Sequence, residues 1–404
     1  FPWLACGTML LTGALIFACF RYVQDRGRES AASTTPTTVA GEGDTLTIAA
    51  AGDVNVTQAL LDSTRGADGS YDFSRMILGA APLLSGADLT VADLEVNFCG
   101  APYDPAAYNA PESLLTALSG AGVDLVQTAN TVSVYNGVAG LSSTLAAVER
   151  AGLLPVGTFA TEEQARQTKG FTMVEVKGFR VAFVAFTKGL GGMGLPAGSE
   201  DCVNLLYTDY DSNYKQVDKK GITGILSKVA AEKPDITVAM LHWGSVNSDE
   251  ISKTQTQIVD LMQKNGVDVI IGSHPHLLQK IELNEKTGKL VAYSLGDFYG
   301  DAQLGGSNYS VILDIEITKD ADLKTTKVTN FSYIPIYTEK ETECDGYRRV
   351  VRIEQAMYAY ENNYVDKVTA DSYTAMQKAM KRIPERITGT KADSTTTSTT
   401  AATT

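Results

Sequence analysis

Short runs of apolar and β-branched residues alternate along the chain with stretches whose apolar residues recur every three or four positions. The runs predict strands and the stretches predict helices, because side chains repeat every two residues on a strand and every 3.6 residues on a helix. Strands are expected at Leu46–Ala51, Leu89–Ala92, Val123–Thr128, Leu153–Val156, Phe179–Phe186, Ile236–Leu241 and Val267–Ile271. Helices are expected at Ser74–Leu84, Glu112–Ala121, Ala139–Ala151, Tyr214–Ala231 and Lys253–Lys264. This alternation predicts an α/β sandwich built on a largely central sheet.

The pattern changes in the C-terminal third of the chain. Two short apolar runs flank Asn284–Gly288, which is a hairpin signal, and longer β-rich runs follow. The strands expected here are Ile281–Leu283, Leu290–Ser294, Tyr309–Ile317 and Thr326–Ile336. Antiparallel strands should therefore close the sheet. Two helices are expected to pack outside the sandwich, at Tyr347–Glu361 and Ala370–Arg382.

The two ends differ from this folded middle. No charged residue occurs from Trp3 to Phe20, a run long enough for a transmembrane signal anchor or the apolar core of a secretion signal. Cys19 follows Ile16-Phe17-Ala18, so a lipoprotein cleavage site with a lipidated cysteine is a further alternative. We divide the chain into an anchor segment (1–22), a flexible linker (23–45), a main domain (46–337), C-terminal helices (338–385) and a disordered Thr/Ser-rich tail (386–404).

Charge and cysteine content exclude several functional classes. The chain carries 47 acidic and 34 basic residues, a formal net charge of −13. This balance argues against nucleic acid or an anionic membrane surface as the main partner, since both require clustered Lys and Arg. The five cysteines have no C-x-x-C spacing, so neither a zinc ribbon nor a disulfide framework is indicated.

Polar side chains of the metal-ligand type follow five of the predicted strands. In open α/β sheets the ligand crevice lies beyond the carboxyl ends of the strands, so these clusters should converge on one rim. The clusters are Gly52-Asp53, Asp93-Leu94-Glu95, Asn130-Thr131, His242-Trp243-Gly244 and Gly272-Ser273-His274-Pro275-His276.

The chain has three histidines, and all of them fall in two of these clusters. Pro275 favours an extended backbone, so His274 and His276 can project to the same side. Together with His242 they suit a divalent ion such as Mn, Fe or Zn, and Asp53 and Glu95 can add oxygen ligands. An isolated histidine is more often a hydrogen-bonded loop residue, but three beside carboxylates favour a metal site.

The remaining polar residues have weaker assignments. Asp93 and Glu95 share a face of an extended segment, where burying both carboxylates without a cation would be costly. Asp93 and His242 are the candidates for a catalytic role. Asn130 is a supporting candidate that could equally be an ordinary turn residue, and Asp297 can support the rim from behind the ligands. Asp53 could instead be a turn or helix-capping residue.

Five segments of the chain together resemble the CapA-like family of bacterial capsule (poly-γ-glutamate) synthesis proteins. They are Ala51–Asp53, Ala87–Glu95, His242–Gly244, Gly272–His276 and Ser294–Phe298. The resemblance implies a fold like that of calcineurin-like metallophosphatases, a four-layer α/β/β/α sandwich. It also implies metal ligands at Asp53, Glu95, His242, His274 and His276.

The chain departs from this family's pattern at several positions. Asp93 and Asp297 stand where the family usually has asparagine. In the family's Ala-Asn-Asn-His segment, Thr131 replaces the second asparagine and Val132 replaces the histidine. In phosphatase-type sites such a histidine contributes roughly two to four orders of magnitude in rate. Phosphoesterase activity of the usual kind is therefore not expected.

Three functions remain open at this stage. The first is a membrane-anchored, metal-dependent hydrolase or transferase whose extracellular domain acts on an envelope polymer or its phosphorylated precursor. The second is a non-catalytic component that holds polymer or other capsule-synthesis membrane proteins. The third is a cell-surface phosphodiesterase or nucleotidase, a class that normally retains the Asn-His pair.

Overall fold

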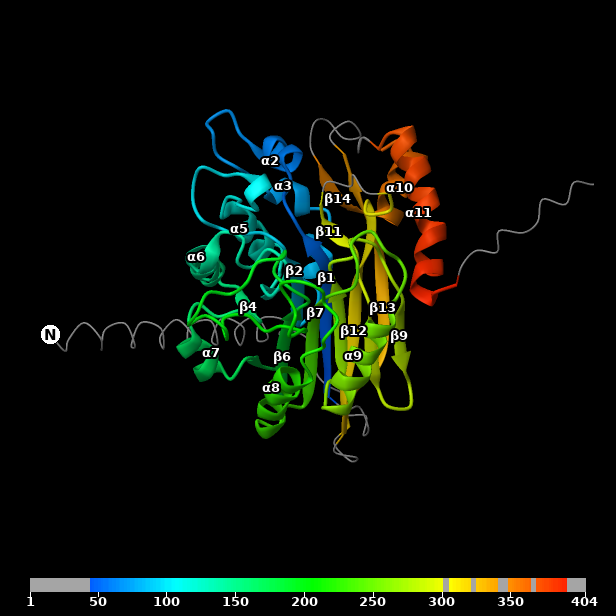
Figure 1. Cartoon of the computed structure of the whole chain (residues 1–404). Helices are drawn as coiled ribbons and strands as arrows, with labels where there is room; N and C mark the ends of the chain where they lie inside the picture. Colours follow the sequence, from blue (N-terminus) through cyan, green and yellow to red (C-terminus); the bar gives the residue numbers. More distant parts are fainter. Residues whose placement is uncertain (1–43, 301–304, 321–324, 341–347, 365–367, 391–404) are drawn as a thin grey trace, which may run out of the picture.

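The computed structural model describes residues 44–300, 305–320, 325–340, 348–364 and 368–390. In these residues two β-sheets pack face to face, and helices lie on their outer faces (Figure 1). No helix within the described ranges is both long and apolar enough to cross a membrane. The anchor segment expected at 1–22 and most of the predicted tail lie outside the described residues.

The first sheet has eight strands, and its centre is β1. On one side of β1 lie parallel strands, and on the other side antiparallel ones. The parallel set is β1 (Asp44–Val54), β2 (Leu89–Leu94), β3 (Leu125–Gln127) and β4 (Leu154–Val156). The antiparallel set is β12 (Tyr309–Asp320), β13 (Thr325–Glu339) and β14 (Arg349–Arg352). A short strand, β11 (Asp297–Tyr299), pairs with the end of β1 and sets Asp297 opposite Asp53.

The second sheet has six strands in the order β5-β6-β7-β8-β10-β9. Its four central strands are parallel, and the outer two pair antiparallel with their neighbours. The strands are β5 (Thr172–Val176), β6 (Phe179–Thr187), β7 (Ile236–His242), β8 (Val269–Ser273), β9 (Ile281–Asn284) and β10 (Lys289–Ala292).

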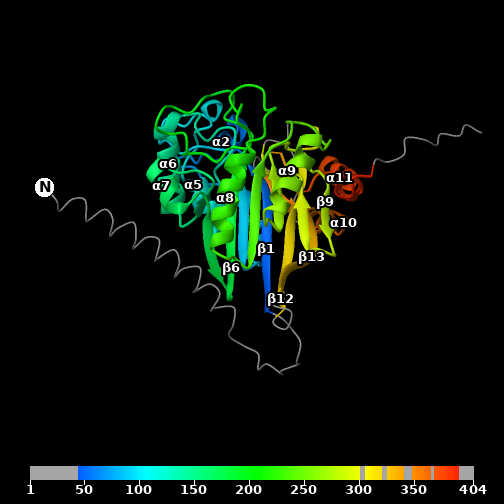
Figure 2. The ribbon, with the colours of Figure 1, turned by 60° about the horizontal axis from the view of Figure 1, so that its bottom comes forward.

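Successive side chains of the central strands point to opposite faces of each sheet, and this separates the core into layers. Ile48 and Val91 of the first sheet pack with Phe183 and Met240 of the second, all fully or almost fully buried. The outer face of the first sheet packs against α2 (Gln58–Thr64), α3 (Ser74–Ile77), α4 (Ala81–Leu84), α5 (Ser113–Gly120) and α6 (Gly137–Arg150). The second sheet packs against α8 (Lys219–Ala231) and α9 (Lys253–Lys264). Figure 2 shows these helices on either side of the strands.

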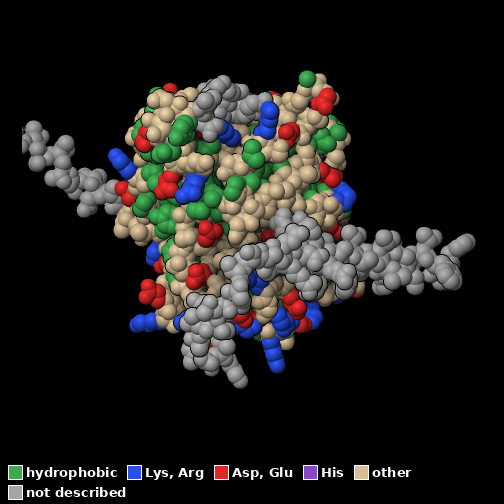
Figure 3. Space-filling model, turned by 180° about the vertical axis from the view of Figure 1, so that it is seen from behind, with side chains coloured by type: hydrophobic (Ala, Val, Ile, Leu, Met, Phe, Trp, Pro, Cys, Tyr) green, Lys and Arg blue, Asp and Glu red, His purple; other side chains and the backbone are tan. Residues whose placement is uncertain are grey.

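Two further helices lie at one side of the sandwich. α10 (Ile353–Glu361) and α11 (Ala370–Thr388) pack on each other and on β9, β12 and β13. A single-turn helix, η1 (Pro105–Ala107), and α7 (Glu162–Thr168) complete the described helices. On the face seen in Figure 3, Lys and Arg side chains are interspersed with those of Asp and Glu.

The predicted mixed α/β class, the seven N-terminal strands and the hairpin at Asn284–Gly288 are confirmed. Three predictions of helices are wrong in part. The helix expected at Ser74–Leu84 is broken into α3 and α4. The helix expected from Tyr214 begins only at Lys219, because Tyr214 is left-handed and the Asp209 carboxylate binds the next two N–H groups. Residues Arg349–Arg352, expected in a helix, form β14, because Val350 and Val351 suit a strand.

Candidate metal centre

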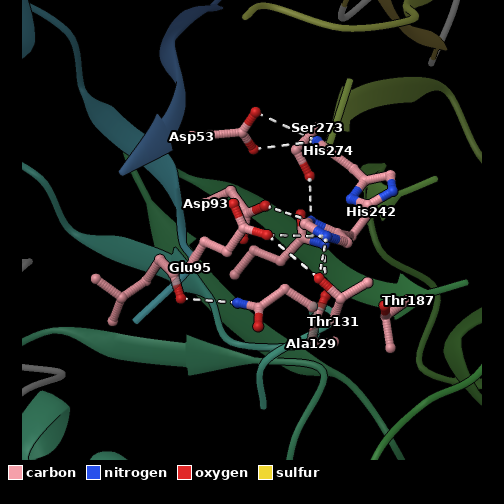
Figure 4. Close-up of polar contacts among 12 residues, drawn as sticks. Asp53, Asp93, Glu95, Ala129, Thr131, Thr187, His242, Ser273 and His274 are labelled. Atoms are coloured by element: carbon pink, nitrogen blue, oxygen red, sulfur yellow. Dashed lines mark hydrogen bonds and ion pairs between the residues drawn. The ribbon is translucent and has the colours of Figure 1, made fainter. Parts of the chain in front are cut away.

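The predicted clusters meet at the carboxyl ends of the central parallel strands of both sheets. Asp53 and Asp93 lie at the ends of β1 and β2, and Glu95 directly follows β2. His242 is the last residue of β7, and His274 and His276 follow β8. Figure 4 shows the carboxylates on one side of the centre facing His242 and His274 on the other. The expectation that these segments share one rim is confirmed.

His242 is held in one orientation by Asp93. Its Nδ1 lies 2.7 Å from Asp93 Oδ2 and 3.2 Å from Ser273 Oγ. An Nδ1–H that donates to a carboxylate leaves the lone pair on Nε2, which is the usual arrangement behind a metal-binding histidine. Nε2 lies 3.6 Å from Glu95 Oε1, so the available nitrogen faces the centre.

His276 repeats this arrangement with Asp297. Its Nδ1 lies 2.8 Å from Asp297 Oδ1 and 3.6 Å from Asp53 Oδ2. Its Nε2 lies 3.7 Å from Glu95 Oε2. The β1–β11 pairing brings Asp297 to Asp53, which explains why a residue far along the sequence supports the same rim.

His274 and His276 both have left-handed backbones, with φ of 90° and 58°, so the extended backbone expected around Pro275 is not found at these two residues. Such φ values are uncommon for residues other than glycine and persist only where surrounding contacts hold them. Asp53 supplies such a contact, because its two carboxylate oxygens accept the His274 N–H at 3.1 and 3.3 Å. Asp53 therefore fixes the segment that carries both histidines.

The donor atoms fit a divalent ion. His274 Nδ1 and Asp93 Oδ1 are buried and have no hydrogen-bond partner among the described residues. Two ligands of a tetrahedral ion, each about 2.1 Å from it, lie roughly 3.4 Å apart, close to the 3.6 and 3.7 Å between Glu95 and the two histidine Nε2 atoms. Three overlapping groups have ligand spacing: Glu95, His242 and His274; Asp53, Asp93 and His242; and Asp53, His276 and Asp297.

Burial makes the centre electrostatically costly without a cation. Desolvation raises the pKa of Asp53 well above its usual range, and neighbouring carboxylates add to the shift while His276 opposes it. Desolvation likewise raises the pKa of Glu95. Burial lowers the pKa of His274 well below its usual range, with smaller contributions from His242 and Lys188. A neutral His274 is the form that binds a metal.

His276 titrates in the opposite direction. Burial lowers its pKa, but the hydrogen bond to Asp297 and the charges of Asp297, Asp53 and Glu95 outweigh this and raise the pKa to about 11. Without a metal His276 is therefore a cation that partly neutralises the carboxylates. A divalent ion would take over that role and displace the proton.

The segment after β3 contributes a hydroxyl rather than an amide or imidazole. The Thr131 hydroxyl donates to Glu95 Oε1 at 3.2 Å and lies 3.3 Å from His242 Nε2. Asn130 is occupied by the backbone: its Nδ2 donates to the Leu94 carbonyl and its Oδ1 accepts the Val132 N–H. Val132 itself is buried. Thr131 is thus the residue of this segment that contacts the centre.

No role was predicted from the sequence for Thr131, Ser273 or Lys188. The signal that identified the other residues, a position at the carboxyl end of a central strand, applies to all three. Each lies at or just after the carboxyl end of a central strand. Lys188 follows β6, which lies beside β7 in the second sheet.

Several known proteins are similar to this chain. The PGA biosynthesis protein CapA of Bacillus subtilis (strain 168) is 24% identical over 288 residues, 71% of this chain and 71% of that protein. The capsule biosynthesis protein CapA of Bacillus anthracis is 27% identical over 193 residues, 48% of this chain and 44% of that protein.

Solved structures are similar at lower identity. The calcineurin-like phosphoesterase YfkN of Bacillus subtilis is 13% identical, with a TM-score of 0.42 over 85% of this chain and 98% of that one. A phosphatase of Mycoplasma pneumoniae is 13% identical, with a TM-score of 0.41 over 73% of this chain and 94% of that one.

The sequence profile described as "Bacterial capsule synthesis protein PGA_cap" matches residues 47–302. This range contains every residue of the centre, from Asp53 through His276 to Asp297. The resemblance to the CapA-like family is confirmed, and the chain belongs to the bacterial capsule synthesis protein family.

Proposed function

We propose that this protein is a metal-dependent hydrolase or transferase that acts on an envelope polymer, or on a phosphorylated precursor of it, during capsule synthesis. The observation that carries the proposal is the buried arrangement of three histidines against four carboxylates, in which Asp93 and Asp297 orient two of the histidines. Such buried charges are seldom kept without a cation or a catalytic role.

The arrangement of the donor atoms is best accounted for by two neighbouring ion positions. Glu95, His242 and His274 would hold one ion, and Asp53 and His276 the other, with Asp297 orienting His276. Glu95 lies between them, because one of its oxygens faces His242 and the other faces His276. The chemistry that divalent ions supply at such a site is activation of water and polarisation of a phosphoryl or carbonyl oxygen.

The protein's own residues would orient the ligands and exclude water. Asp93 keeps the His242 ring in the tautomer that turns Nε2 inward, and Asp53 holds the strained segment at His274. The Thr131 hydroxyl, beside Glu95, is placed to hydrogen-bond a reacting oxygen. It cannot serve as the proton donor that a histidine in this segment would supply, so turnover should be slow.

Family membership and the apolar segment 1–22 support a proposal for the cellular setting. We propose that segment 1–22 anchors the protein in the membrane and that the folded domain is extracellular, where an envelope polymer is assembled or exported. Other membrane proteins of capsule synthesis are the expected partners.

A second candidate is a non-catalytic component that uses the same domain to hold polymer. It is favoured by Val132, a buried aliphatic residue at the position where the family pattern has histidine. Val132→His discriminates between the two. An enzyme whose rate is limited by the missing group should hydrolyse a generic phosphodiester faster in this variant, whereas a binding component should stay inactive.

The proposed function is tested with His274→Ala combined with His276→Ala in the metal-reconstituted protein. The double variant should lose both bound metal and hydrolysis of bis(p-nitrophenyl) phosphate, by at least about tenfold in rate. Unchanged metal content together with unchanged activity would rule the proposal out.

A further inference from the structure

Lys188 contacts the segment His242–Gly244 at the metal centre. It directly follows β6, and its N–H donates to the His242 carbonyl at 2.8 Å. Its Nζ donates to the Gly244 carbonyl at 2.6 Å and lies 4.9 Å from the centroid of the Tyr214 ring. Thr187, the preceding residue, lies on the His242 side of the centre in Figure 4. The ammonium group is therefore held at the edge of the centre by both backbone and side chain.

The charge of Lys188 is not neutralised by a carboxylate. Lys169 and Lys177 form ion pairs with Glu232 and Asp88, but among the described residues Lys188 forms none. Its side chain is half-buried. A partly desolvated ammonium without a counter-ion is stabilised when an anion arrives.

A glycine-containing loop follows Lys188 and passes beside the rim. Gly191, Gly192 and Gly194 are exposed, and the first two have positive φ. A Cβ at Gly191 would lie 3.3 Å from the Thr131 carbonyl oxygen, so this loop passes directly beside the rim. Glycines allow a ligand to approach the backbone closely.

We propose that Lys188, with the glycine loop beside it, forms an oxyanion subsite that takes a phosphoryl or carboxylate group of the ligand next to the metal centre. This inference rests on the proposed function, and it adds that the ligand carries a negatively charged group next to the metal centre. Lys188 supplies a fixed positive charge on the histidine side of the centre.

The test is calorimetric titration of the full-length protein with inorganic phosphate. Lys188→Gln should raise the Kd of phosphate at least tenfold, a loss typical of one charge-assisted hydrogen bond, while Lys188→Arg should retain most of the affinity. Lys215→Gln is the matched control, because Lys215 is exposed on the neighbouring segment and its loss changes net charge equally. A Kd within twofold of the wild type in Lys188→Gln, or an equal loss in Lys215→Gln, would overturn the proposal.

A structural role for Lys188 is separated by a second readout. Trp243 lies between the two residues whose carbonyls Lys188 binds, so in a Trp3→Phe background its fluorescence reports movement of this segment. The subsite requires lost phosphate binding with unchanged emission, melting temperature and metal content. Loss of phosphate binding together with changed emission, a lower melting temperature and a lower metal content would assign Lys188 a structural role and overturn the subsite.

Two further arms identify the anion and separate this inference from the proposed function. Glutarate titrated in parallel shows whether the subsite takes carboxylates, phosphoryl groups or both, and Lys188-dependent binding of either supports it. The same titrations are made on chelator-treated protein. If the wild type binds no metal but still shows Lys188-dependent anion binding, only the proposed function is refuted. If neither the untreated nor the chelator-treated protein shows Lys188-dependent anion binding, the subsite is overturned.

Discussion

Carboxylate–histidine pairs set the chemistry of individual residues in this centre. Asp93 and Asp297 each bind the Nδ1 of one histidine, at 2.7 and 2.8 Å, and both stand where the family pattern usually has asparagine. A carboxylate accepts from Nδ1–H and raises the basicity of the other nitrogen more than an amide would. Under the proposed function, the two carboxylates would make His242 and His276 stronger ligands, in a chain that lacks the histidine of the neighbouring segment.

Asp93→Asn tests this orienting role. The amide can present its N–H to Nδ1 and so favour the wrong tautomer, so metal affinity should fall about 10- to 100-fold with little change in the melting temperature of the metal-free protein. Competition with a chromophoric chelator measures the affinity. Asp211→Asn, an exposed aspartate, serves as control, and equal affinities for both variants would contradict the role of Asp93.

Metal binding should release protons. His276 has a pKa of about 11 in the metal-free protein and is charged at neutral pH, while the raised pKa values of Asp53 and Glu95 favour their protonated forms. Because an ion must displace these protons, its apparent affinity should rise with pH through the neutral range. Calorimetry in two buffers of different ionisation enthalpy counts the protons. Binding without proton release, or affinity that falls as pH rises, would contradict this account.

At the scale of elements, the centre depends on close contact between β1 and the turn before β11. A Cβ at Gly52 would lie 1.7 Å from the Gly296 carbonyl oxygen, which itself accepts the Asp53 N–H. Gly52→Ala should therefore destabilise the fold by more than about 2 kcal/mol, because backbone cannot move aside as a side chain can. Gly120→Ala, in open space at the end of α5, should be neutral or stabilising. Denaturant unfolding compares them, and similar stabilities would contradict the packing argument.

Some of these elements can be predicted from the sequence, and others cannot. Strands such as Ile236–His242 are largely apolar runs that end in a residue of the metal-ligand type, so both their position and their candidate chemistry are visible in the pattern. The break between α3 and α4 and the strand at Arg349–Arg352 are decided by tertiary pairing, which periodicity does not report. The side-chain partners Asp93–His242 and Asp297–His276 also depend on how the two sheets meet, and only their strand-end positions could be anticipated.

At the scale of the whole molecule, the centre joins the two sheets. Asp53, Asp93 and Glu95 come from the first sheet, and all three histidines come from the second. A bound ion should therefore stabilise the sandwich, by about 2.7 kcal/mol at a free concentration of 100 times its Kd. Chelation should lower the melting temperature of the wild type by several degrees and that of His242→Ala by clearly less. Equal shifts in both proteins would show that the ion binds elsewhere.

Elemental analysis of the purified protein beside His242→Ala tests the central claim most directly. After reconstitution with manganese, iron or zinc, we expect about two ions per wild-type chain and at most about one in the variant. A wild type that retains no stoichiometric metal under any of these conditions would contradict the account, and the domain would then act by binding alone.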